Sequence, residues 1–280
     1  MNASSTAEPA LLAALEQAGL DTVEGAFSYA GGEDLSKANL GRRRRTKLCL
    51  MGPGGRVYEL YLKRYDRQNL LGRLRHWLVY GRRGPARAEF QNVAAARAAG
   101  VPTMQEVCYG QEFHPWDAFC PLAATRGYVV VTAVAGASLE KCGREFLARN
   151  AARRDRIAEL TGKLADLVRS LHQAGLVHRD LYSSHVFLDE RNAEIGLYLI
   201  DLARMFRPCW RRFRWKVKDL AQLKYSMPPE WARQWWDSFL DGYLGDCGPA
   251  LREKYSLAIE RKQAAIARHA RRRNPEARQG

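Results

Sequence analysis

The first half of the chain is a succession of short apolar runs separated by glycine- and proline-rich turns. Runs of aromatic, β-branched and other apolar residues predict strands at residues 26–30, 47–51, 57–65, 106–109 and 127–132. Residues 52–55, with the sequence GPGG, have a turn composition and predict a hairpin between the second and third of these strands. Helices are predicted at residues 69–80 and 86–99, and Gly100 ends the second of them.

The pattern changes to helices after residue 136. Apolar residues recur at helical spacing between residues 152 and 174, and Gly175 ends that helix. Two short strands are predicted at residues 186–188 and 197–200, and most of the remaining sequence is helical and basic. The chain is therefore predicted to be α+β and bilobal, with a helical extension at residues 1–25, a small antiparallel-sheet lobe at 26–135, a larger helical lobe at 136–270 and a basic tail at 271–280.

Charge adds an expectation about partners. The 280 residues include 45 Lys and Arg against 30 Asp and Glu, a formal net charge of +15. Such an excess favours polyanionic partners, among them nucleotides, nucleic acid, an anionic membrane face or a phosphorylated glycolipid. A large part of the charge is equally well explained as a solvated surface, so composition alone does not choose among these partners.

Cysteine usage and hydropathy set further limits. The six cysteines include no C-x-x-C pair, which argues against a zinc site and against a dense disulfide framework. We therefore expect reduced thiols and a cytoplasmic location. No apolar segment is long enough to cross a bilayer, so any contact with the inner face of the cytoplasmic membrane is expected to be peripheral.

The sequence His178-Arg179-Asp180 follows the long predicted helix, and Asp201 ends a short apolar strand about twenty residues later. This order is that of a protein-kinase catalytic loop and its metal-binding aspartate. Phosphoryl transfer needs one carboxylate to orient or accept a proton from the acceptor hydroxyl and another to hold Mg²⁺ on the phosphates. Asp180 fits the first role and Asp201 the second, so the chain is predicted to bind ATP and Mg²⁺.

Lys63 lies in a predicted strand and Glu89 in the following helix. In kinases a strand lysine contacts the nucleotide phosphates and pairs with a helix glutamate. A solvated lysine and an ordinary helical glutamate are the simpler interpretation, and the downstream motif favours the functional one. A glycine-rich phosphate loop is missing: Gly31, Gly32 and the basic run at residues 39–45 are the candidates, as a phosphate cradle or as a solvated basic turn.

The chain resembles the Kdo/WaaP family of lipopolysaccharide kinases over about residues 61–227. The motifs that carry the resemblance are YLKR at residues 61–64, AEF at 88–90, GVPT at 100–103, HRDLYSSH at 178–185, LIDLAR at 199–204 and KDLAQL at 218–223. The resemblance implies a protein-kinase-like fold and ATP- and Mg²⁺-dependent phosphorylation of Kdo or heptose in the lipopolysaccharide core glycolipid.

Two residues acquire roles through this resemblance. His185 stands where a protein kinase has asparagine, and it is expected either to ligate Mg²⁺ or to hydrogen-bond Asp180 or the substrate. Oxygen ligands suit Mg²⁺ better than a ring nitrogen, which favours the hydrogen bond. Asp219 is expected to play a structural part by accepting backbone hydrogen bonds from the catalytic loop.

Two amphipathic basic segments, residues 69–84 and 207–218, suit an anionic glycolipid or the membrane surface that carries it. Core packing explains the tryptophans of the second segment equally well, and nucleic acid is not an expected partner. Two other functions stay open at this point. One is a protein or small-molecule kinase of the same fold, and the other is a pseudokinase acting as a basic membrane-associated adaptor.

Overall fold

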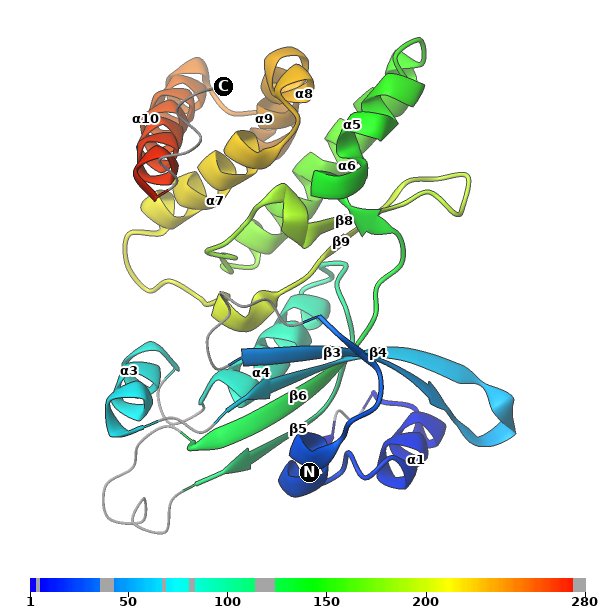
Figure 1. Ribbon diagram of the computed structural model, residues 1–280. Coiled ribbons are helices and arrows are strands. Elements are labelled where there is room, and N and C mark those ends of the chain that lie inside the picture. Colours follow the sequence, from blue (N-terminus) through cyan, green and yellow to red (C-terminus); the bar gives the residue numbers. More distant parts are fainter. Residues whose placement is uncertain (4–5, 36–42, 67–68, 81–83, 114–123, 274–280) are drawn as a thin grey trace. The chain divides into compact units, whose positions relative to one another are not determined.

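The computed structural model describes residues 1–3, 6–35, 43–66, 69–80, 84–113 and 124–273. The chain forms two compact units (Figure 1). The first, called here the sheet unit, comprises residues 1–97 and 104–133. The second, the helical unit, comprises residues 98–103 and 134–280. The basic run at residues 39–42 and most of the tail, residues 274–280, lie outside the described part of the chain.

The sheet unit is built on an antiparallel sheet with the strand order β1-β5-β6-β4-β3-β2. Its strands are β1 (Asn2–Ala3), β2 (Glu33–Asp34), β3 (Arg43–Met51), β4 (Val57–Tyr65), β5 (Glu106–Glu112) and β6 (Arg126–Thr132). The predicted hairpin joins β3 and β4 through the short 3₁₀ turn η2 (Pro53–Gly55). Gly54 and Gly55 have φ angles of 78° and 77°, a conformation that residues with a Cβ rarely adopt.

Strand β3 begins four residues earlier than predicted, because Arg43, Arg44 and Arg45 continue the ladder with β4 instead of forming a loop. Arg44 Nη2 pairs with Asp66 at 3.0 Å, and the Arg43 guanidinium lies over the Tyr65 ring. These contacts give Arg44 and Arg43 partners within the sheet unit. The alternation of arginines across the strand faces was hidden in the sequence by an uninterrupted run of four basic residues.

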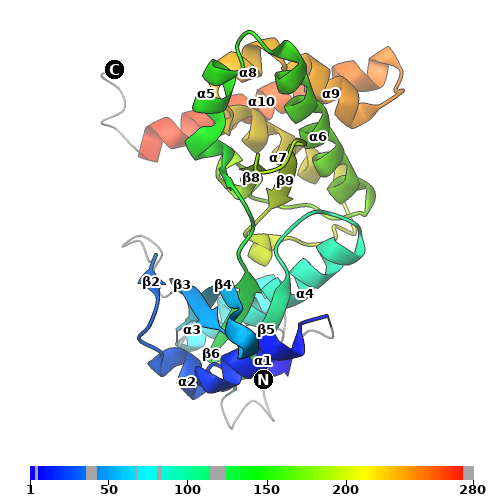
Figure 2. The same cartoon turned by 90° about the vertical axis from the view of Figure 1, so that its right-hand side faces the viewer.

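The strand predicted at residues 26–30 is wrong. Residues Val23–Ser28 form a short helix, α2, whose first turn is capped by Thr22, which accepts a hydrogen bond from the N–H of Gly25 at 3.0 Å. Helix α1 (Pro9–Gln17) precedes it, and both lie against the sheet (Figure 2). The core between the helices and the sheet is apolar and includes Leu11, Leu15, Leu20, Leu48, Leu60 and Leu62.

Two further helices of the sheet unit confirm the predicted helical periodicity. They are α3 (Leu70–Tyr80) and α4 (Gly84–Ala98). Helix α4 buries Glu89 on the side that faces the sheet core, and Gly100 follows the helix with a φ of 73°. The left-handed conformation at Gly100 ends the helix, as glycine commonly does at this position.

The helical unit holds a small three-stranded sheet in the order β7-β8-β9. Its strands are β7 (Ala137–Ser138), β8 (Val186–Asp189) and β9 (Gly196–Leu199), and its helices are α5 (Leu139–Arg149), α6 (Arg154–Gln173), α7 (Arg212–Ser226), α8 (Pro229–Gln234), α9 (Trp236–Leu244) and α10 (Pro249–Arg273). Helix α6 packs against α9, and α7 against α10 (Figure 2). The fully buried Trp231 anchors this core and donates from Nε1 to Thr161 at 3.0 Å. Among the described helices, none is long and apolar enough to cross a membrane.

Candidate active site

The loop after α6 is fastened to helix α7 by Asp219. The buried carboxylate of Asp219 accepts hydrogen bonds from the backbone N–H groups of His178 at 2.7 Å and Arg179 at 2.8 Å. This confirms the structural part predicted for Asp219. Two hydrogen bonds to one charged carboxylate fix the backbone at both His178 and Arg179. The position of the next residue, Asp180, is thereby determined by α7.

A second layer of side chains holds Asp219 itself. His172 of α6 places Nε2 at 3.3 Å from the Asp219 carboxylate and Nδ1 at 2.8 Å from the Tyr243 hydroxyl of α9. All three side chains are buried, and burial raises the pKa of Tyr243, so the hydroxyl keeps its proton. Helices α6, α7 and α9 thus meet at one polar network directly behind the catalytic loop.

His178 orients the loop from inside the unit. Its Nε2–H donates to the carbonyl of Ile200 at 3.0 Å, which ties the catalytic loop to the segment that carries Asp201. Burial lowers the pKa of His178, which favours a neutral ring. Among the described residues, its Nδ1 has no hydrogen-bond partner, as a neutral acceptor nitrogen in an apolar site allows.

Arg204 and Lys218 place positive charge beside Asp180. Arg204, in the 3₁₀ turn η6 (Leu202–Arg204), donates from Nη1 to both Asp180 carboxylate oxygens, at 3.1 and 2.8 Å. Lys218 of α7 donates to the carbonyl of Arg179 and lies 3.8 Å from Asp180. Burial lowers the pKa of Lys218. The sequence motifs included Arg204 and Lys218, but their contact with Asp180 was not predicted from them.

His185 contacts Asp180 through the main chain. Its Nδ1 lies 2.7 Å from the carbonyl oxygen of Asp180, and because a carbonyl only accepts, Nδ1 carries the proton. In the neutral ring, Nε2 is then left with a lone pair, and it lies 3.8 Å from the Asp201 carboxylate. The hydrogen bond expected between His185 and Asp180 is present, with the backbone carbonyl as acceptor.

Asp201 has a left-handed backbone conformation, with φ 58° and ψ 56°. A non-glycine residue in this region costs energy and is held there only by its surroundings. Ile200 donates its backbone N–H to the carbonyl of His185 at 3.0 Å, so the strained turn is tied to the catalytic loop. The turn points the Asp201 carboxylate toward the free nitrogen of His185.

His185 Nε2 and the Asp201 carboxylate are suited to form one side of a divalent cation site. A carboxylate and a neutral imidazole nitrogen are ordinary metal ligands, and Mg²⁺ commonly takes one or two protein ligands with water and phosphate completing its shell. Within the described part of the chain, no group of three or more His, Cys, Asp and Glu side chains is arranged to hold a metal alone. The pair therefore suits a cation that arrives with a nucleotide.

In the sheet unit, Lys63 of β4 forms the expected ion pair with Glu89 of α4. Lys63 is 6% exposed and Glu89 is fully buried. The second carboxylate oxygen of Glu89 accepts from the Tyr65 hydroxyl at 2.7 Å and lies 3.5 Å from Arg43 Nη2. A buried carboxylate with three donors holds the lysine in one place, which is what a phosphate-binding ammonium group requires.

The predicted phosphate-loop glycines lie before β2. Gly32 has a φ of 86°, and a Cβ there would come within 2.4 Å of the Lys47 carbonyl oxygen, so the position requires glycine for close packing on β3. Gly31 precedes it beside the Tyr29 hydroxyl. Their packing explains both glycines structurally, and a role in phosphate binding stays a prediction.

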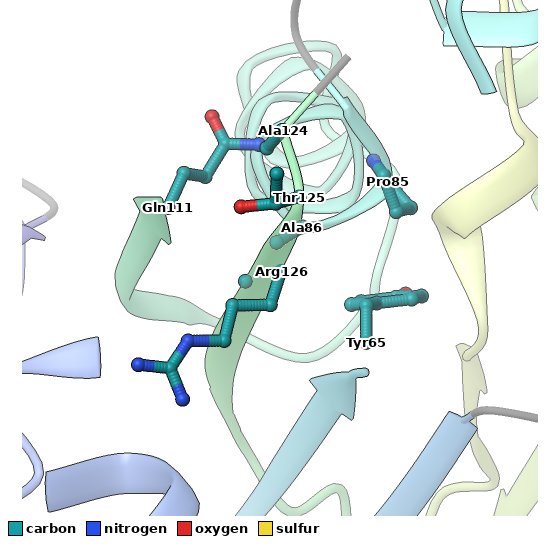
Figure 3. Close-up of a pocket in the computed structure, with 8 residues that line it drawn as sticks. Tyr65, Pro85, Ala86, Gln111, Ala124, Thr125 and Arg126 are labelled. Atoms are coloured by element: carbon teal, nitrogen blue, oxygen red, sulfur yellow. The ribbon is translucent and has the colours of Figure 1, made fainter. Parts of the chain in front are cut away.

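A cavity in the sheet unit lies between β4, α4 and β6, lined by Tyr65, Pro85, Ala86, Gln111 and residues 124–127 (Figure 3). Figure 3 shows Gln111 and Arg126 on one side of the start of β6 and Tyr65 and Pro85 on the other. Its volume of ≈ 10 Å³ is enough for about one water molecule. The cavity is therefore a packing gap and not a ligand site.

Comparison with known sequences gives a family match. A sequence model of the lipopolysaccharide kinase (Kdo/WaaP) family matches residues 39–243. Two curated relatives are each named lipopolysaccharide core heptose(I) kinase WaaP. The one from Pseudomonas aeruginosa is 31% identical over 146 residues, which cover 50% of this chain and 52% of that protein. The one from Escherichia coli is 28% identical over 142 residues, which cover 49% and 51%. The chain thus spans about half the length of these relatives.

A comparison with solved structures finds a protein of the same family name with a similar fold. A solved structure described as WaaP in complex with acyl carrier protein matches with a TM-score of 0.57 and 23% sequence identity, covering 84% of this chain and 89% of that one. A likeness at this identity establishes the fold. The predicted α+β, kinase-like architecture, with an antiparallel sheet in one unit and helices in the other, is confirmed.

Proposed function

Because the chain belongs to the lipopolysaccharide kinase (Kdo/WaaP) family, we propose that it is an ATP-dependent kinase of the lipopolysaccharide core. The acceptor is a sugar hydroxyl of the inner core, on Kdo or heptose. The observation that carries the proposal is the loop around Asp180, which Asp219 fastens and Arg204 contacts. A carboxylate held this firmly beside cations suits the task of orienting a hydroxyl for phosphoryl transfer.

Each catalytic residue has a role in the proposal. Asp180 acts as the base that receives the proton of the acceptor hydroxyl. Lys63, held by Glu89, binds the α- and β-phosphates of ATP. The backbone around Gly31 and Gly32 contributes to the phosphate site in this assignment. The ion pair with Glu89 supports the role of Lys63, since a buried lysine that is paired with a buried carboxylate keeps a defined position.

Asp201 and His185 are the residues that would hold Mg²⁺. The cation supplies charge neutralisation on the transferred phosphoryl group when it is bound. The protonation of His185 at Nδ1 supports this assignment, because it leaves Nε2 free to accept a ligand bond beside Asp201.

The proposed partners are the lipopolysaccharide core glycolipid and the anionic membrane surface that carries it. Helix α3 supports peripheral association with a membrane, because its apolar residues face solvent. Leu71 is 75% exposed, Leu78 is 72% exposed and Trp77 is 41% exposed. Exposed leucines and a tryptophan on a helix within a basic segment are the features of an interfacial helix.

A transfer assay with competing acceptors tests the proposal. Purified protein is incubated with Mg²⁺ and ATP in the presence of core glycolipid, a generic protein substrate or an aminoglycoside, and the products are measured by mass spectrometry. The proposal predicts phosphate gain on the glycolipid only. Gain on the protein or the aminoglycoside with none on the glycolipid would assign the chain to another acceptor. A melting temperature that Mg²⁺-ATP leaves unchanged would indicate a non-catalytic adaptor.

A further inference from the structure

A groove lies between strand β9 and helix α6, entirely within the helical unit (Figure 2). Its volume is ≈ 450 Å³, within the range typical of sites for small organic ligands. We call it the β9 groove. None of its lining residues has a role in the proposed kinase site. They come from β9 and its start, from one face of α6 and from the segment after α4, and are Gly100, Pro102, Lys163, Asp166, Leu167, Ser170 and residues 195–198.

The edge of β9 along the groove is the one that does not pair with β8. In an antiparallel ladder, alternate residues direct their N–H and carbonyl groups to the partner strand, and the residues between them direct these groups to the other side. Ile200 donates its N–H to the carbonyl of His185 at 3.0 Å, which continues the ladder with β8. Residues 196 and 198 therefore bond to β8, and residues 195, 197 and 199 face the groove edge.

Ile195, at the start of this edge, has both backbone groups satisfied by α6. Its N–H donates to the Glu159 carboxylate at 3.0 Å, and its carbonyl accepts from Lys163 Nζ at 2.8 Å. These two side chains reach from the helix to the strand. They close the β9 groove at the start of the strand.

Leu199, at the other end, is satisfied by the segment after α4. Its N–H donates to the carbonyl of Pro102 at 2.9 Å, and its carbonyl accepts from the Thr103 hydroxyl at 2.6 Å. Leu197 lies midway, and none of the residues that the structure describes bonds to its N–H or its carbonyl on this edge. Leu197 is only 6% exposed. Because buried backbone groups are nearly always paired, this donor and acceptor mark a place for a ligand.

The open part of the edge is short. From Ile195 to Leu199 the strand advances about 13 Å, at about 3.3 Å per residue. Both ends are closed, so an added strand of several residues cannot pair along this edge. Leu197 offers one donor and one acceptor side by side. The complement is a compact group with an N–H next to a carbonyl, as in a lactam or a nucleobase.

The two charged residues that line the β9 groove are compensated by ion pairs. Lys163 pairs with Glu194 at 3.2 Å, and Asp166 pairs with Arg169 at 2.5 Å. Side chains that are already paired gain little from a charged ligand, which would have to displace their partners. The groove therefore favours a neutral ligand, although the chain as a whole has a net charge of +15.

We propose that the β9 groove binds a neutral heterocycle of nucleobase type, whose ring N–H donates to the Leu197 carbonyl and whose ring carbonyl accepts from the Leu197 N–H. Leu167, Pro102 and Tyr198 supply apolar surface beside this edge. Mostly apolar walls with a few fixed polar groups are the usual composition of a small-molecule site. The inference is independent of the proposed kinase function, because no residue of the groove takes part in that function.

Calorimetric titration of the full chain with nucleosides tests the site. Uridine and inosine each carry a ring N–H beside a ring carbonyl, and 3-methyluridine and 1-methylinosine lack that N–H. We expect saturable binding of uridine or inosine and about tenfold weaker binding of its methylated form, because one hydrogen bond is lost. No binding of either nucleoside, or equal binding of the methylated form, overturns the inference. Tighter binding of N-acetylalanine methylamide, an extended peptide unit, overturns it as well.

The titration is run with saturating Mg²⁺ and adenylyl imidodiphosphate, a non-hydrolysable ATP analogue. Nucleoside binding that the analogue abolishes would belong to the ATP site and would overturn the inference. Nucleoside binding that persists while no acceptor gains phosphate from ATP leaves the groove assignment standing and contradicts the kinase proposal alone.

A filling substitution locates the bound nucleoside. S170F places a ring in the groove from the partly buried Ser170 of α6 and is expected to weaken binding by about tenfold or more. S256F, at a partly buried serine of α10 outside the groove, is the matched control and is expected to leave binding unchanged. Unchanged affinity in S170F, or equal weakening in both variants, contradicts the inference. S170L, a smaller filling, is expected to weaken binding in the same direction if S170F fails to fold.

Discussion

Arg204 donates from one nitrogen to both carboxylate oxygens of Asp180, at 3.1 and 2.8 Å. The contact joins the segment after Asp201 to the catalytic loop, so the two carboxylates of the site are positioned relative to each other by one guanidinium. R204A is expected to lower kcat for phosphoryl transfer by about 10²-fold, the effect of losing one preorganised electrostatic contact. Steady-state kinetics with ATP and core glycolipid measure it.

The R204K variant separates the effect of the positive charge from that of the shape of the guanidinium group. R204K keeps the charge and is expected to recover only part of the rate, because an ammonium group cannot reproduce the fixed fork of the guanidinium. R233A, at an exposed arginine of α8, is expected to have wild-type kinetics. Wild-type kcat in R204A would show that the Arg204–Asp180 contact has no part in catalysis.

The tautomer of His185 predicts metal preference. With Nδ1 committed to the Asp180 carbonyl, Nε2 is the proposed ligand atom, and a ring nitrogen binds the transition-metal ion Mn²⁺ more readily than Mg²⁺, which prefers oxygen ligands. H185N replaces the nitrogen ligand with an oxygen and is expected to raise the ratio of Mg²⁺- to Mn²⁺-supported kcat. H185A is expected to lower activity with both ions. A metal titration of each variant checks this, and an unchanged Mg²⁺ to Mn²⁺ ratio in H185N would remove His185 from the metal site.

The Lys63–Glu89 pair predicts a link between stability and nucleotide binding. K63A is expected to destabilise the protein by about 3 kcal/mol, because among the described residues the buried Glu89 then keeps contacts to Tyr65 and, more distantly, Arg43 alone. Thermal shift should show that wild type gains about 2.7 kcal/mol at an ATP concentration of one hundred times Kd. K63A should gain far less.

The control for this pair is a lysine elsewhere in the same sheet. Lys47 of β3 pairs with the exposed Glu59 at 3.4 Å, so K47A is expected to keep both its stability and its ATP-dependent shift. An undiminished ATP shift in K63A would show that Lys63 does not contact the nucleotide.

Membrane association is predicted to depend on α3. L71S/L78S removes two exposed leucines and is expected to weaken sedimentation with anionic lipid vesicles by about tenfold or more, from the loss of apolar burial. The fold should be unaffected because both side chains face solvent. L251S/L257S, at leucines of α10 that are 44% and 46% exposed, is the matched control. Equal vesicle binding by both double variants would exclude α3 as the contact.

The lowered pKa of Glu159 is expected to make the stability of the protein depend on pH. Partial burial raises the pKa of this carboxyl. The Ile195 N–H and the Arg156 guanidinium lower the pKa, and together they outweigh the effect of burial, so the net shift is downward. A lowered folded-state pKa contributes stability above the unfolded value of 4.5, and that stability is lost as the pH falls through the folded pKa. E159Q is expected to unfold at lower urea than wild type at pH 7.

The difference between E159Q and wild type should shrink as the pH is lowered below 4.5. At pH 7 the loss is expected to be about 1 kcal/mol, the typical net value of a hydrogen bond. E145Q, at an exposed position of α5, should match wild type throughout. A constant difference between E159Q and wild type from pH 7 to pH 3 would contradict the assignment.

The contacts of Asp219 and of the Lys63–Glu89 pair were predictable from sequence, because the order of the motifs along the chain indicates which elements these residues join. Asp219 had to reach the backbone of the catalytic loop, and it bonds to His178 and Arg179. The same holds for the Lys63–Glu89 pair, which joins a strand to the next long helix. In each case a charged side chain that is buried needs a hydrogen-bonding or charged partner.

Other features depended on local geometry that a sequence pattern does not show. The aromatic and apolar residues 26–30 suggested a strand, yet a single side-chain cap from Thr22 starts a helix there. The contact of Arg204 with Asp180 follows from the left-handed turn at Asp201, a conformation that no residue preference indicated. The β9 groove required the packing of a strand, a helix and the segment after α4, which are far apart in sequence.

Mass spectrometry of core glycolipid tests the proposed kinase function in cells in which the gene is intact, deleted or replaced by the Asp180→Asn variant. We expect that deletion removes a phosphate from an inner-core sugar, that the wild-type gene restores it, and that Asp180→Asn does not. A core with unchanged phosphate content after deletion, or full restoration by Asp180→Asn, would contradict it.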